Sequence, residues 1–459
     1  MIEALSELLS PKLVKGDPES LSIWGRDWTR SFKVAPSAIV FPETVEHVVA
    51  LVRRANERGW SLVPSGGRTG LSGGAVAGNG EVVVSFDRMN RILDFDAADR
   101  IALCQAGVVT QALQAFAVER GLCYPVDFAS SGSSQIGGNI ATNAGGIRVI
   151  RHGLTRDWVS GLKVVTGAGA VLDLNHGLVK NATGYDLRHL FIGSEGTLGF
   201  VVEAQMRLDA APAQQMVMVL GIERLADILT VLARFQREVT LSAFEFFSEL
   251  ALQKVTAHRK LRRPLQQAAA FYALLEFDVD MLDTALTIFQ SCVDLGLVGD
   301  GVVSQNEAQA KELWQLREGI SESIAPFTPY KNDVSVRISA VPEFLTQVDA
   351  VVRDAYPDFE VVWYGHIGDG NLHLNILKPA TLSIDDFFAR CHHISPRIFE
   401  VVAKHRGSIS AEHGVGLLKR DFLQYSRSAE EVAAMRAMKS IFDPNGVMNP
   451  GKLIAPPTP

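Results

Sequence analysis

The chain has 459 residues, enough for two or three domains, and its 47% hydrophobic and 21% charged residues are typical of a globular protein rather than a disordered or fibrous one. A formal net charge of −7, with no stripe dense in lysine and arginine, argues against nucleic-acid binding. No apolar run approaches the ~18 residues of a membrane span, the N-terminus lacks a signal-peptide pattern, and four scattered cysteines favour reduced thiols, so we expect a cytoplasmic protein.

Residues 36–64 predict a small unit made of a strand, a helix and a second strand. The first strand covers 38–41, the helix is capped near Thr44 with valines at helical spacing, and the second strand covers 61–63. The unit leads into SGGRTGLSGG (65–74), where glycine lets backbone N–H groups encircle an anion such as a pyrophosphate. A flexible surface loop is the alternative for this stretch taken alone.

Three more glycine-rich segments follow, at residues 130–146, 181–187 and 193–208. Their recurrence in one region predicts several backbone loops that converge on one long ligand. The stretch TGAGAVLDL (166–174) superficially resembles a dinucleotide fingerprint, but it lies between two strand patterns and predicts a hairpin turn. Nicotinamide binding on a Rossmann fold is therefore disfavoured.

The glycine density falls after about residue 212, where amphipathic helices begin to alternate with apolar strands such as AAFYALLEF. We predict a first domain over residues 1–212 and a second over 213–405. The last segment, 406–459, is predicted to return to the first domain.

The second domain contains YGHIGDGNLHLNI (364–376), in which two histidines lie seven residues apart. If Asp369 and Gly370 form the two-residue turn of a β-hairpin, His366 lies directly opposite His373. Directly opposed side chains have Cβ atoms roughly 4.5 to 5.5 Å apart, so both rings reach one ion. Two hydrogen-bonded histidines at a strand end are the alternative.

Taken in their order along the chain, these motifs carry a family resemblance. It rests on PSAIVFPETVEHVVALVRRANERGWSLVPSGGRTGLSGG, QIGGNIATNAGG, NATGYDLRHLFIGSEGTLG, GHIGDGNLHLN, SAEHGVGLLKR and DPNGVMNPGKL. The chain resembles the D-2-hydroxyacid dehydrogenases among the FAD flavoproteins of the vanillyl-alcohol-oxidase (PCMH) type, over nearly its whole length. The segments LSAFEF and YKNDVSV are most similar to the D-2-hydroxyglutarate dehydrogenases in this family. The resemblance implies an α+β protein with a two-subdomain FAD-binding domain, an antiparallel-sheet substrate domain with helices, and a small helical C-terminal segment.

The resemblance also implies which residues bind FAD, mostly in the glycine loops around the pyrophosphate. These are Ser65, Gly66, Gly67, Arg68, Thr69, Gly70, Pro125, Asp127, Gly132, Ser133, Gly137, Gly138, Asn139, Thr142, Asn143, Gly145, Gly146, Glu195, Gly199, Val201 and Asn449. Some members tether FAD through a histidine in the first loop. Arg68 stands in that loop here, so we expect a non-covalent flavin.

A metal site is expected where Glu412 of SAEHG joins His366 and His373. Two nitrogens and a carboxylate are compatible with zinc in a site that keeps positions open. The same set suits Fe(II), Mn(II) or Co(II), and the resemblance favours zinc. A structural polar cluster is the alternative.

His413 is the expected base, because an imidazole with a pKa near 6.5 is suited to accept the proton of a secondary alcohol. Neighbouring residues point in opposite directions on an extended backbone, so Glu412 and His413 serve one cavity only if the chain bends. Gly414 and Gly416 permit that bend. A histidine that caps a turn is the alternative.

Cationic anchors for an acidic substrate are expected at Arg317 and Lys331. Arg317 and Ser321 share a helix face, and Asn375 lies on the strand face of His373. Most D-2-hydroxyglutarate dehydrogenases have threonine at the place of Ser321, and the spacing to Lys331 is one residue shorter here, which leaves the substrate length open. For an isolated arginine or lysine, a surface salt bridge is the alternative.

The resemblance thus implies FAD- and metal-dependent oxidation of D-2-hydroxyglutarate, with D-malate as a further substrate, by hydride transfer from C2 to flavin N5. Electrons would then pass to an electron-transfer flavoprotein or a quinone-linked acceptor. Alternatives are a D-lactate or glycolate dehydrogenase, a flavin subunit of an electron-transfer complex, and an NADPH-using reductase. A homodimer is compatible with this assignment, but no residue pattern identifies its interface.

Overall fold

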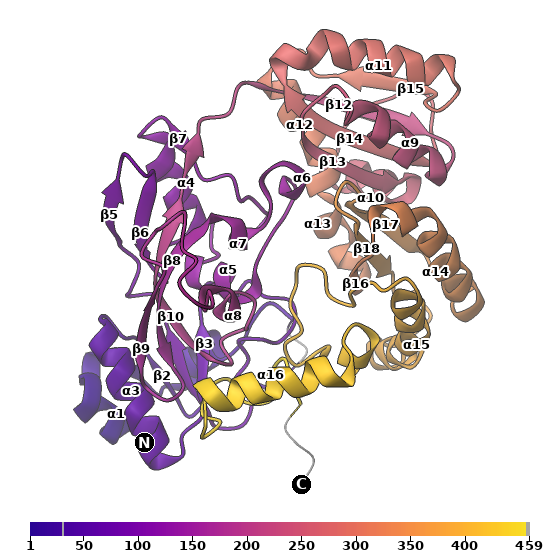
Figure 1. Cartoon of the computed structure of the whole chain (residues 1–459). Helices are drawn as coiled ribbons and strands as arrows, with labels where there is room; N and C mark the ends of the chain where they lie inside the picture. Colours follow the sequence, from indigo (N-terminus) through magenta and orange to yellow (C-terminus); the bar gives the residue numbers. More distant parts are fainter. Residues whose placement is uncertain (30–31, 456–459) are drawn as a thin grey trace. The chain divides into compact units, whose positions relative to one another are not determined.

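The computed structural model describes residues 1–29 and 32–455. The chain forms two compact units (Figure 1). The first unit consists of residues 1–145, 153–211 and 412–459, and the second consists of residues 146–152 and 212–411. The second unit is therefore inserted into the first, and the last segment of the chain belongs to the first unit.

The first unit contains two larger sheets and a two-stranded one. The strand order is β1-β2-β4-β3 in the four-stranded sheet, β5-β6-β10-β8-β9 in the five-stranded sheet, and β11-β7 in the smallest. The bounds are β1 Val14–Lys15, β2 Ala38–Val40, β3 Leu62–Ser65, β4 Val82–Ser85, β5 Ile92–Asp96, β6 Ile101–Gln105, β7 Leu122–Cys123, β8 Val159–Thr166, β9 Val171–Leu174, β10 Gly199–Arg207 and β11 Asp209–Ala210.

The α-helices of the first unit come from all three of its segments. They are α1 Ile2–Leu9, α2 Pro18–Trp24, α3 Val45–Arg58, α4 Thr110–Val118, α5 Ile136–Thr142, α7 Thr155–Trp158, α8 Arg188–Phe191 and α16 Ala429–Phe442. Short 3₁₀ helices cover Pro11–Leu13 and Arg420–Tyr425. The C-terminal helix α16 is drawn in yellow in Figure 1, and the backbone N–H of Ala168, in the turn after β8, donates to the carbonyl of Phe442 at its end.

The predicted strand, helix and strand of residues 36–64 are confirmed as β2, α3 and β3. The helix begins after Thr44, whose hydroxyl accepts a hydrogen bond from the backbone of His47 at 3.2 Å. Its valine and leucine face packs into the core against β2 and β4. The two strands do not pair with each other, because β4 lies between them and pairs in parallel with both. The predicted hairpin at residues 166–174 is also confirmed, as the antiparallel pair β8 and β9.

The second unit is built on one seven-stranded antiparallel sheet in the order β15-β12-β14-β13-β17-β18-β16. Its strands are β12 Gln215–Ile222, β13 Leu241–Ser248, β14 Phe271–Asp278, β15 Asp300–Val303, β16 Tyr330–Ser335, β17 Val361–His366 and β18 Asn371–Ile376. Its helices are α6 Val149–His152, α9 Leu225–Phe235, α10 Glu249–Arg259, α11 Leu282–Asp294, α12 Glu307–Glu318, α13 Ile320–Ile324, α14 Val341–Ala355 and α15 Ile384–Lys404, with 3₁₀ turns at Val279–Met281, Ala325–Phe327 and Ile338–Ala340. The antiparallel-sheet domain with helices is therefore confirmed.

The histidine hairpin exists as β17 and β18, but its predicted register is wrong. His366 lies opposite Asn371, and His373 lies opposite Tyr364. The turn is longer than two residues because the N–H groups of Asp369 and Gly370 both donate to the carbonyl of His366. Gly368 donates instead to the carbonyl of Phe244 on β13, so it cannot pair across the turn.

No helix in the parts of the chain that the structure describes is long and apolar enough to span a membrane.

Candidate active site

One face of the sheet in the second unit carries a row of polar side chains, which we call the polar face. Side chains alternate between the two sides of a strand, and the register places Asp333 opposite His373 and Lys331 opposite Asn375. The polar face comprises Glu245, Lys331, Asp333, Tyr364, His366, Asn371, His373 and Asn375. All except Lys331 are buried. Buried polar groups need specific partners, so this arrangement indicates a site rather than a packing surface.

The two histidines of the polar face remain neighbours in spite of the changed register. Their ring centroids are 5.3 Å apart and nearly perpendicular, because they are diagonal neighbours on adjacent strands. The Nδ1 atom of His366 is 2.8 Å from Oε1 of Glu245, and Nδ1 of His373 is 3.7 Å from Oδ1 of Asp333. Each imidazole therefore has one nitrogen beside a carboxylate, a pairing that is typical of histidines that bind metals through the other nitrogen.

Asp333 connects the polar face to the end of the second unit. Its Oδ1 accepts a hydrogen bond from Nδ2 of Asn371 at 2.8 Å. Its Oδ2 accepts one from the backbone N–H of Ala411 at 3.1 Å. Ala411 is the last residue of this unit, and Glu412 follows it directly in the chain.

Arg317 reaches the polar face from α12. Its Nη2 atom lies 2.8 Å from Oε2 of Glu245, and its guanidinium lies 4.7 Å from the ring centre of Tyr364. Arg317 is 5% exposed, yet its Nε and Nη2 make no aligned hydrogen bond, so the contact with Glu245 is an ionic one at an unfavourable angle. Buried donors without acceptors indicate a place for an anionic ligand.

Lys331 and Ser321 form the outer end of the polar face. The Nζ atom of Lys331 is 3.0 Å from the hydroxyl of Ser321 at the beginning of α13. Desolvation by the surrounding protein lowers the pKa of Lys331, although part of its side chain reaches solvent. Next to it on β18, Asn375 is buried and its amide makes only long hydrogen bonds of 3.3 and 3.5 Å to backbone carbonyls.

In the first unit, the first two glycine loops lie against each other. A Cβ on Gly67 would lie 2.0 Å from the carbonyl oxygen of Ser133, so no larger residue fits there without a backbone shift. A Cβ on Gly66 would lie 3.7 Å from the Cα of Gly138, in ordinary contact. Beside Gly138 itself, a Cβ would meet no protein atom within 4 Å. The two loops therefore form a tight seam with open space along α5.

The carboxylate of Asp87 holds this seam together. It accepts hydrogen bonds from Nε1 of Trp24 at 2.8 Å and from Nε2 of Gln135 at 2.8 Å, and it contacts Nη1 of Arg68 at 3.4 Å. The guanidinium of Arg68 also lies 5.5 Å from the ring centre of Trp24. One acidic side chain thus connects α2 and both glycine loops.

Glu195 is buried beneath the loop that carries His413. Its two carboxylate oxygens accept the backbone N–H groups of Val415 and Gly416, each at 2.7 Å. Burial raises the pKa of Glu195, and these two hydrogen bonds oppose that shift. The expected bend is present, since Gly414 and Gly416 have φ of 77° and 51°.

The same loop also touches the first glycine loop. The N–H groups of Leu417 and Leu418 donate to the carbonyl of Ser72 at 2.9 and 3.0 Å. Asn449 donates from its side chain to the carbonyls of Gly74 and Glu195 at 3.0 and 2.7 Å. The first unit therefore brings the His413 loop, Asn449 and the first glycine loop together.

Several residues expected to bind FAD have structural roles. Gly137 packs against Ala106, and Gly199 packs against the backbone of β8. The side chain of Asn139 donates to the hydroxyl of Thr110. The side-chain oxygen of Asn143 accepts a hydrogen bond from the backbone N–H of Arg156. Gly146 belongs to the second unit, while the other expected residues lie in the first: Ser65, Gly66, Gly67, Arg68, Thr69 and Gly70 after β3, Pro125 and Asp127 after β7, Gly132, Ser133, Gly138, Thr142 and Gly145 in or beside α5, Glu195 and Val201 around the start of β10, and Asn449 near the C-terminus.

The residues in this region fit a flavin nucleotide. The hydroxyl of Ser65, fully buried at the end of β3, and the side-chain oxygen of Asn449 have no hydrogen-bond partner. Free buried polar atoms beside close-packed glycine loops are what a long ligand with phosphate and amide groups requires.

Four described residues are candidate ligands of a metal ion: Asp333 and His373 in the second unit, and Glu412 and His413 in the first. Within the second pair, Nε2 of His413 lies 3.6 Å from Oε1 of Glu412, and both side chains are partly exposed. Nitrogen and carboxylate donors of this kind suit zinc and other divalent cations.

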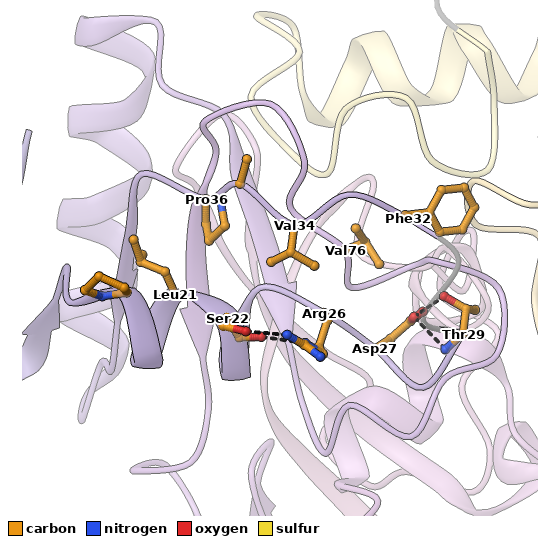
Figure 2. Close-up of a pocket in the computed structure, with 11 residues that line it drawn as sticks. Leu21, Ser22, Arg26, Asp27, Thr29, Phe32, Val34, Pro36 and Val76 are labelled. Atoms are coloured by element: carbon orange, nitrogen blue, oxygen red, sulfur yellow. Dashed lines mark hydrogen bonds between the residues drawn. The ribbon is translucent and has the colours of Figure 1, made fainter.

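A cavity of about 490 Å³ lies beside α2 in the first unit (Figure 2). Its walls include the apolar side chains of Leu21, Val34, Pro36 and Val76. The Nε of Arg26 donates to the carbonyl of Ser22 at 2.6 Å. Asp27 accepts from Thr29 and from the N–H of Gly73, the latter at 2.7 Å. The acidic group of this wall is thus engaged in holding the first glycine loop.

Sequence reasoning missed four residues that complete these sites, namely Glu245, Asp333, Asn371 and Asp87. Glu245 had one signal, since it is the single charge in the apolar strand LSAFEFFS. Asp333 and Asn371 are unremarkable in the sequence, and their roles follow only from strand pairing.

Comparisons with known proteins agree with this architecture. Residues 36–175 match the FAD binding domain model, and residues 211–453 match the model of the FAD linked oxidases, C-terminal domain. The chain is 58% identical over 458 residues to the D-2-hydroxyglutarate dehydrogenase of Stutzerimonas stutzeri, with 99% of each chain covered. It is 53% identical to the enzyme of that name from Xanthomonas citri, with 98% of this chain and 96% of the relative covered.

The structure of 4-ethylphenol oxidase from Gulosibacter chungangensis superposes with a TM-score of 0.78 at 18% identity, covering 99% of this chain and 97% of the other. That likeness shows a fold of the PCMH type. With both domain models matched and such identity over the full length, the chain is an FAD-dependent dehydrogenase and belongs to the family of the D-2-hydroxyglutarate dehydrogenases.

Proposed function

We propose that the protein oxidises D-2-hydroxyglutarate, and D-malate as a second substrate, to the corresponding 2-oxo acids. The reaction uses FAD and a divalent metal ion, for which zinc is the favoured candidate. The names of its relatives support the substrate class. The cationic residues Arg317 and Lys331 support it independently, because a dicarboxylate needs an anchor for its second carboxylate and a monocarboxylate such as lactate does not.

The observation that carries the proposal is the path of residues 411–418. At one end, Ala411 donates to Asp333 on the polar face. At the other, Val415 and Gly416 donate to Glu195, and Leu417 donates to Ser72 of the first glycine loop. Consecutive Cα atoms are only about 3.8 Å apart. Glu412 and His413 lie within this short stretch, directly between a residue that bonds to the polar face and residues that bond beside the first glycine loop.

Each residue then has a role in oxidising the C2 hydroxyl. FAD, when bound, would supply the hydride acceptor, and His366, His373 and Glu412 would hold a cation that supplies positive charge for the reaction. His413 accepts the hydroxyl proton. The remaining polar residues orient the substrate: Arg317, Lys331 and Ser321 hold the distal carboxylate, and Asn375 bonds the polar groups near C2.

The test is anaerobic bleaching of the visible flavin absorbance by D-2-hydroxyglutarate, D-malate, D-lactate and their L forms. Each is measured before EDTA treatment, after it, and after zinc is restored. We expect rapid bleaching by the D-diacids, lost on chelation and regained with zinc. Bleaching by lactate alone would assign the chain to D-lactate oxidation, and bleaching that survives complete metal removal would contradict the metal site.

We further propose that the reduced flavin, bound without a covalent link, passes its electrons to an electron-transfer flavoprotein or a quinone-linked acceptor. Denaturation in acid should release the whole flavin, because Arg68 offers no histidine nitrogen for attachment. Turnover should be fast with a quinone analogue or an electron-transfer flavoprotein and slow with oxygen. A flavin that stays with the precipitate, or turnover fastest with oxygen, would contradict these proposals.

A further inference from the structure

Glu245 is one of the two most buried charges of the polar face, and it contacts two of its functional residues at once. It lies on β13, next to the strand that carries His366, and is 1% exposed. One carboxylate oxygen is 2.8 Å from Nδ1 of His366, and the other is 2.8 Å from Nη2 of Arg317. A single carboxylate therefore connects an expected metal ligand with an expected substrate anchor.

The contact with His366 engages one of its two ring nitrogens. Nδ1 lies 2.8 Å from a carboxylate oxygen, so the tautomer that satisfies this contact has its proton on Nδ1. In that tautomer the lone pair lies on Nε2, the ring nitrogen that does not contact Glu245. This is the tautomer that a metal ligand needs, and partners of this kind strengthen metal binding.

The contact with Arg317 holds its Nη2 atom 2.8 Å from the Glu245 carboxylate and leaves Nε without a hydrogen-bond acceptor. Nε and Nη2 form one edge of the guanidinium, and neither makes an aligned hydrogen bond. The ring of Tyr364 lies 4.7 Å from the guanidinium carbon and limits its movement on one face. A charged N–H donor held in this way can bond a carboxylate oxygen of an anionic ligand.

We propose that Glu245 is a positioning residue that prepares both halves of the site, by engaging Nδ1 of His366 so that Nε2 is left for a metal ion, and by holding Nη2 of Arg317 so that Nε is left for the distal carboxylate of a diacid substrate. The inference rests on the proposed function. It extends that function by making one buried carboxylate responsible for metal affinity and for the preference for dicarboxylates over monocarboxylates.

The experiment compares Glu245→Gln with Glu276→Gln in the FAD-loaded protein. Glu276 is the control, because it is also buried, at 2% exposed, on the adjacent strand β14, and it bonds Arg148 and Trp314 rather than His366 or Arg317. Two quantities are measured: zinc affinity, by competition with a chromogenic chelator in the absence of substrate, and the ratio of kcat/KM for D-2-hydroxyglutarate to that for D-lactate.

For Glu245→Gln we expect zinc affinity to fall about 10- to 100-fold and the diacid preference to fall about tenfold or more. Glu276→Gln should change neither. Wild-type zinc affinity and selectivity in Glu245→Gln would overturn the inference. Loss of both in Glu276→Gln as well would also overturn it, because the effect would then be one of general packing.

If Glu245→Gln does not fold, a second variant tests the same inference. Glu245→Asp keeps the charge that compensates Arg317, but it is one methylene too short to reach both partners, so it should show the same losses at smaller size. Unchanged zinc affinity and selectivity in Glu245→Asp would contradict the inference. If the wild-type protein itself neither binds zinc nor oxidises D-2-hydroxyglutarate, the proposed function fails, and that result is distinct from a failure confined to Glu245.

Discussion

The two units present their ligand-binding groups in opposite ways. The first unit offers backbone: glycine loops packed so closely that a Cβ on Gly67 would overlap Ser133, with few charges among them. The second unit offers buried side chains, in which carboxylates, imidazoles and a guanidinium cover one face of a sheet. Substitutions that add bulk should therefore impair the ligand site of the first unit. Substitutions that change a charge or the position of a proton should impair that of the second.

The largest expected effect concerns the base. His413→Gln should lower kcat by about 10²- to 10⁴-fold, because no side chain then takes the hydroxyl proton. FAD content should stay unchanged, since the loop is held by backbone bonds to Glu195. The exposed His393 on α15 provides the control, and His393→Gln should leave kcat unchanged. Retention of more than a tenth of wild-type kcat in His413→Gln would exclude His413 as the base.

The backbone character of the first unit is tested by two glycines. Gly67→Ala forces a Cβ to within 2.0 Å of the Ser133 carbonyl, so it should lower the Tm of both the FAD-free and the FAD-loaded protein. Gly138→Ala meets open space in the protein and should preserve the Tm without FAD, while weakening FAD binding about tenfold or more if the flavin lies along α5. Differential scanning fluorimetry and fluorescence titration distinguish the two. Equal changes in Tm and in FAD affinity for the two variants would contradict the close packing assigned to Gly67 and the open space assigned to Gly138.

Asp87 is a charged side chain of the first unit that connects both glycine loops. Asp87→Ala removes the acceptor shared by Trp24, Arg68 and Gln135. Losing hydrogen bonds worth about 1 to 2 kcal/mol should weaken FAD binding roughly 5- to 30-fold. The exposed Asp94 is the matched control. An FAD affinity equal to that of Asp94→Ala would show that the loops hold each other without Asp87.

The smallest effect is a pH dependence in the second unit. Hydrogen bonding to Arg151 lowers the pKa of Asp278 below 3.8, so this carboxylate stabilises the fold fully above pH 3.8 and loses that contribution as pH falls through its folded-state pKa. Arg151→Met should lower the free energy of unfolding at pH 6 by less than about 1 kcal/mol, as for a partly exposed pair, and so lower the Tm slightly. The difference should shrink below pH 3.8. A difference that is constant with pH, like that of the exposed control Arg237→Met, would show that the pair contributes no charge interaction.

Much of the fold could be predicted from local pattern. The helix at residues 45–58 has its cap at Thr44 and its apolar stripe within one stretch of sequence, and the glycines that form the loops are themselves the signal. The register of the histidine hairpin could not be predicted, because the N–H of Gly368 bonds to Phe244 on another strand. That contact joins residues more than a hundred positions apart.

The candidate site divides along the same line. His366, His373, Arg317 and the motif at residues 412–414 stand in sequence motifs that identify them. Glu245 and Asp333 acquire their roles only when β13 and β16 come to lie beside the hairpin strands. The roles of Glu245 and Asp333 depend on pairing between strands that are distant in the sequence, and residue spacing within one segment does not predict that pairing.

The last residues of the chain complete the four-stranded sheet region of the first unit. Met448 forms a parallel bridge with Leu62, and the backbone groups of Val447 and Asn449 bond to Leu62 on either side. During synthesis, the flavin-binding half therefore cannot complete this part of its core until residues 447–449 have been translated. The inserted unit is already complete at residue 411 and can fold while translation continues. A chain that stops before Val447 would carry the inserted unit attached to a half that lacks this edge of its sheet.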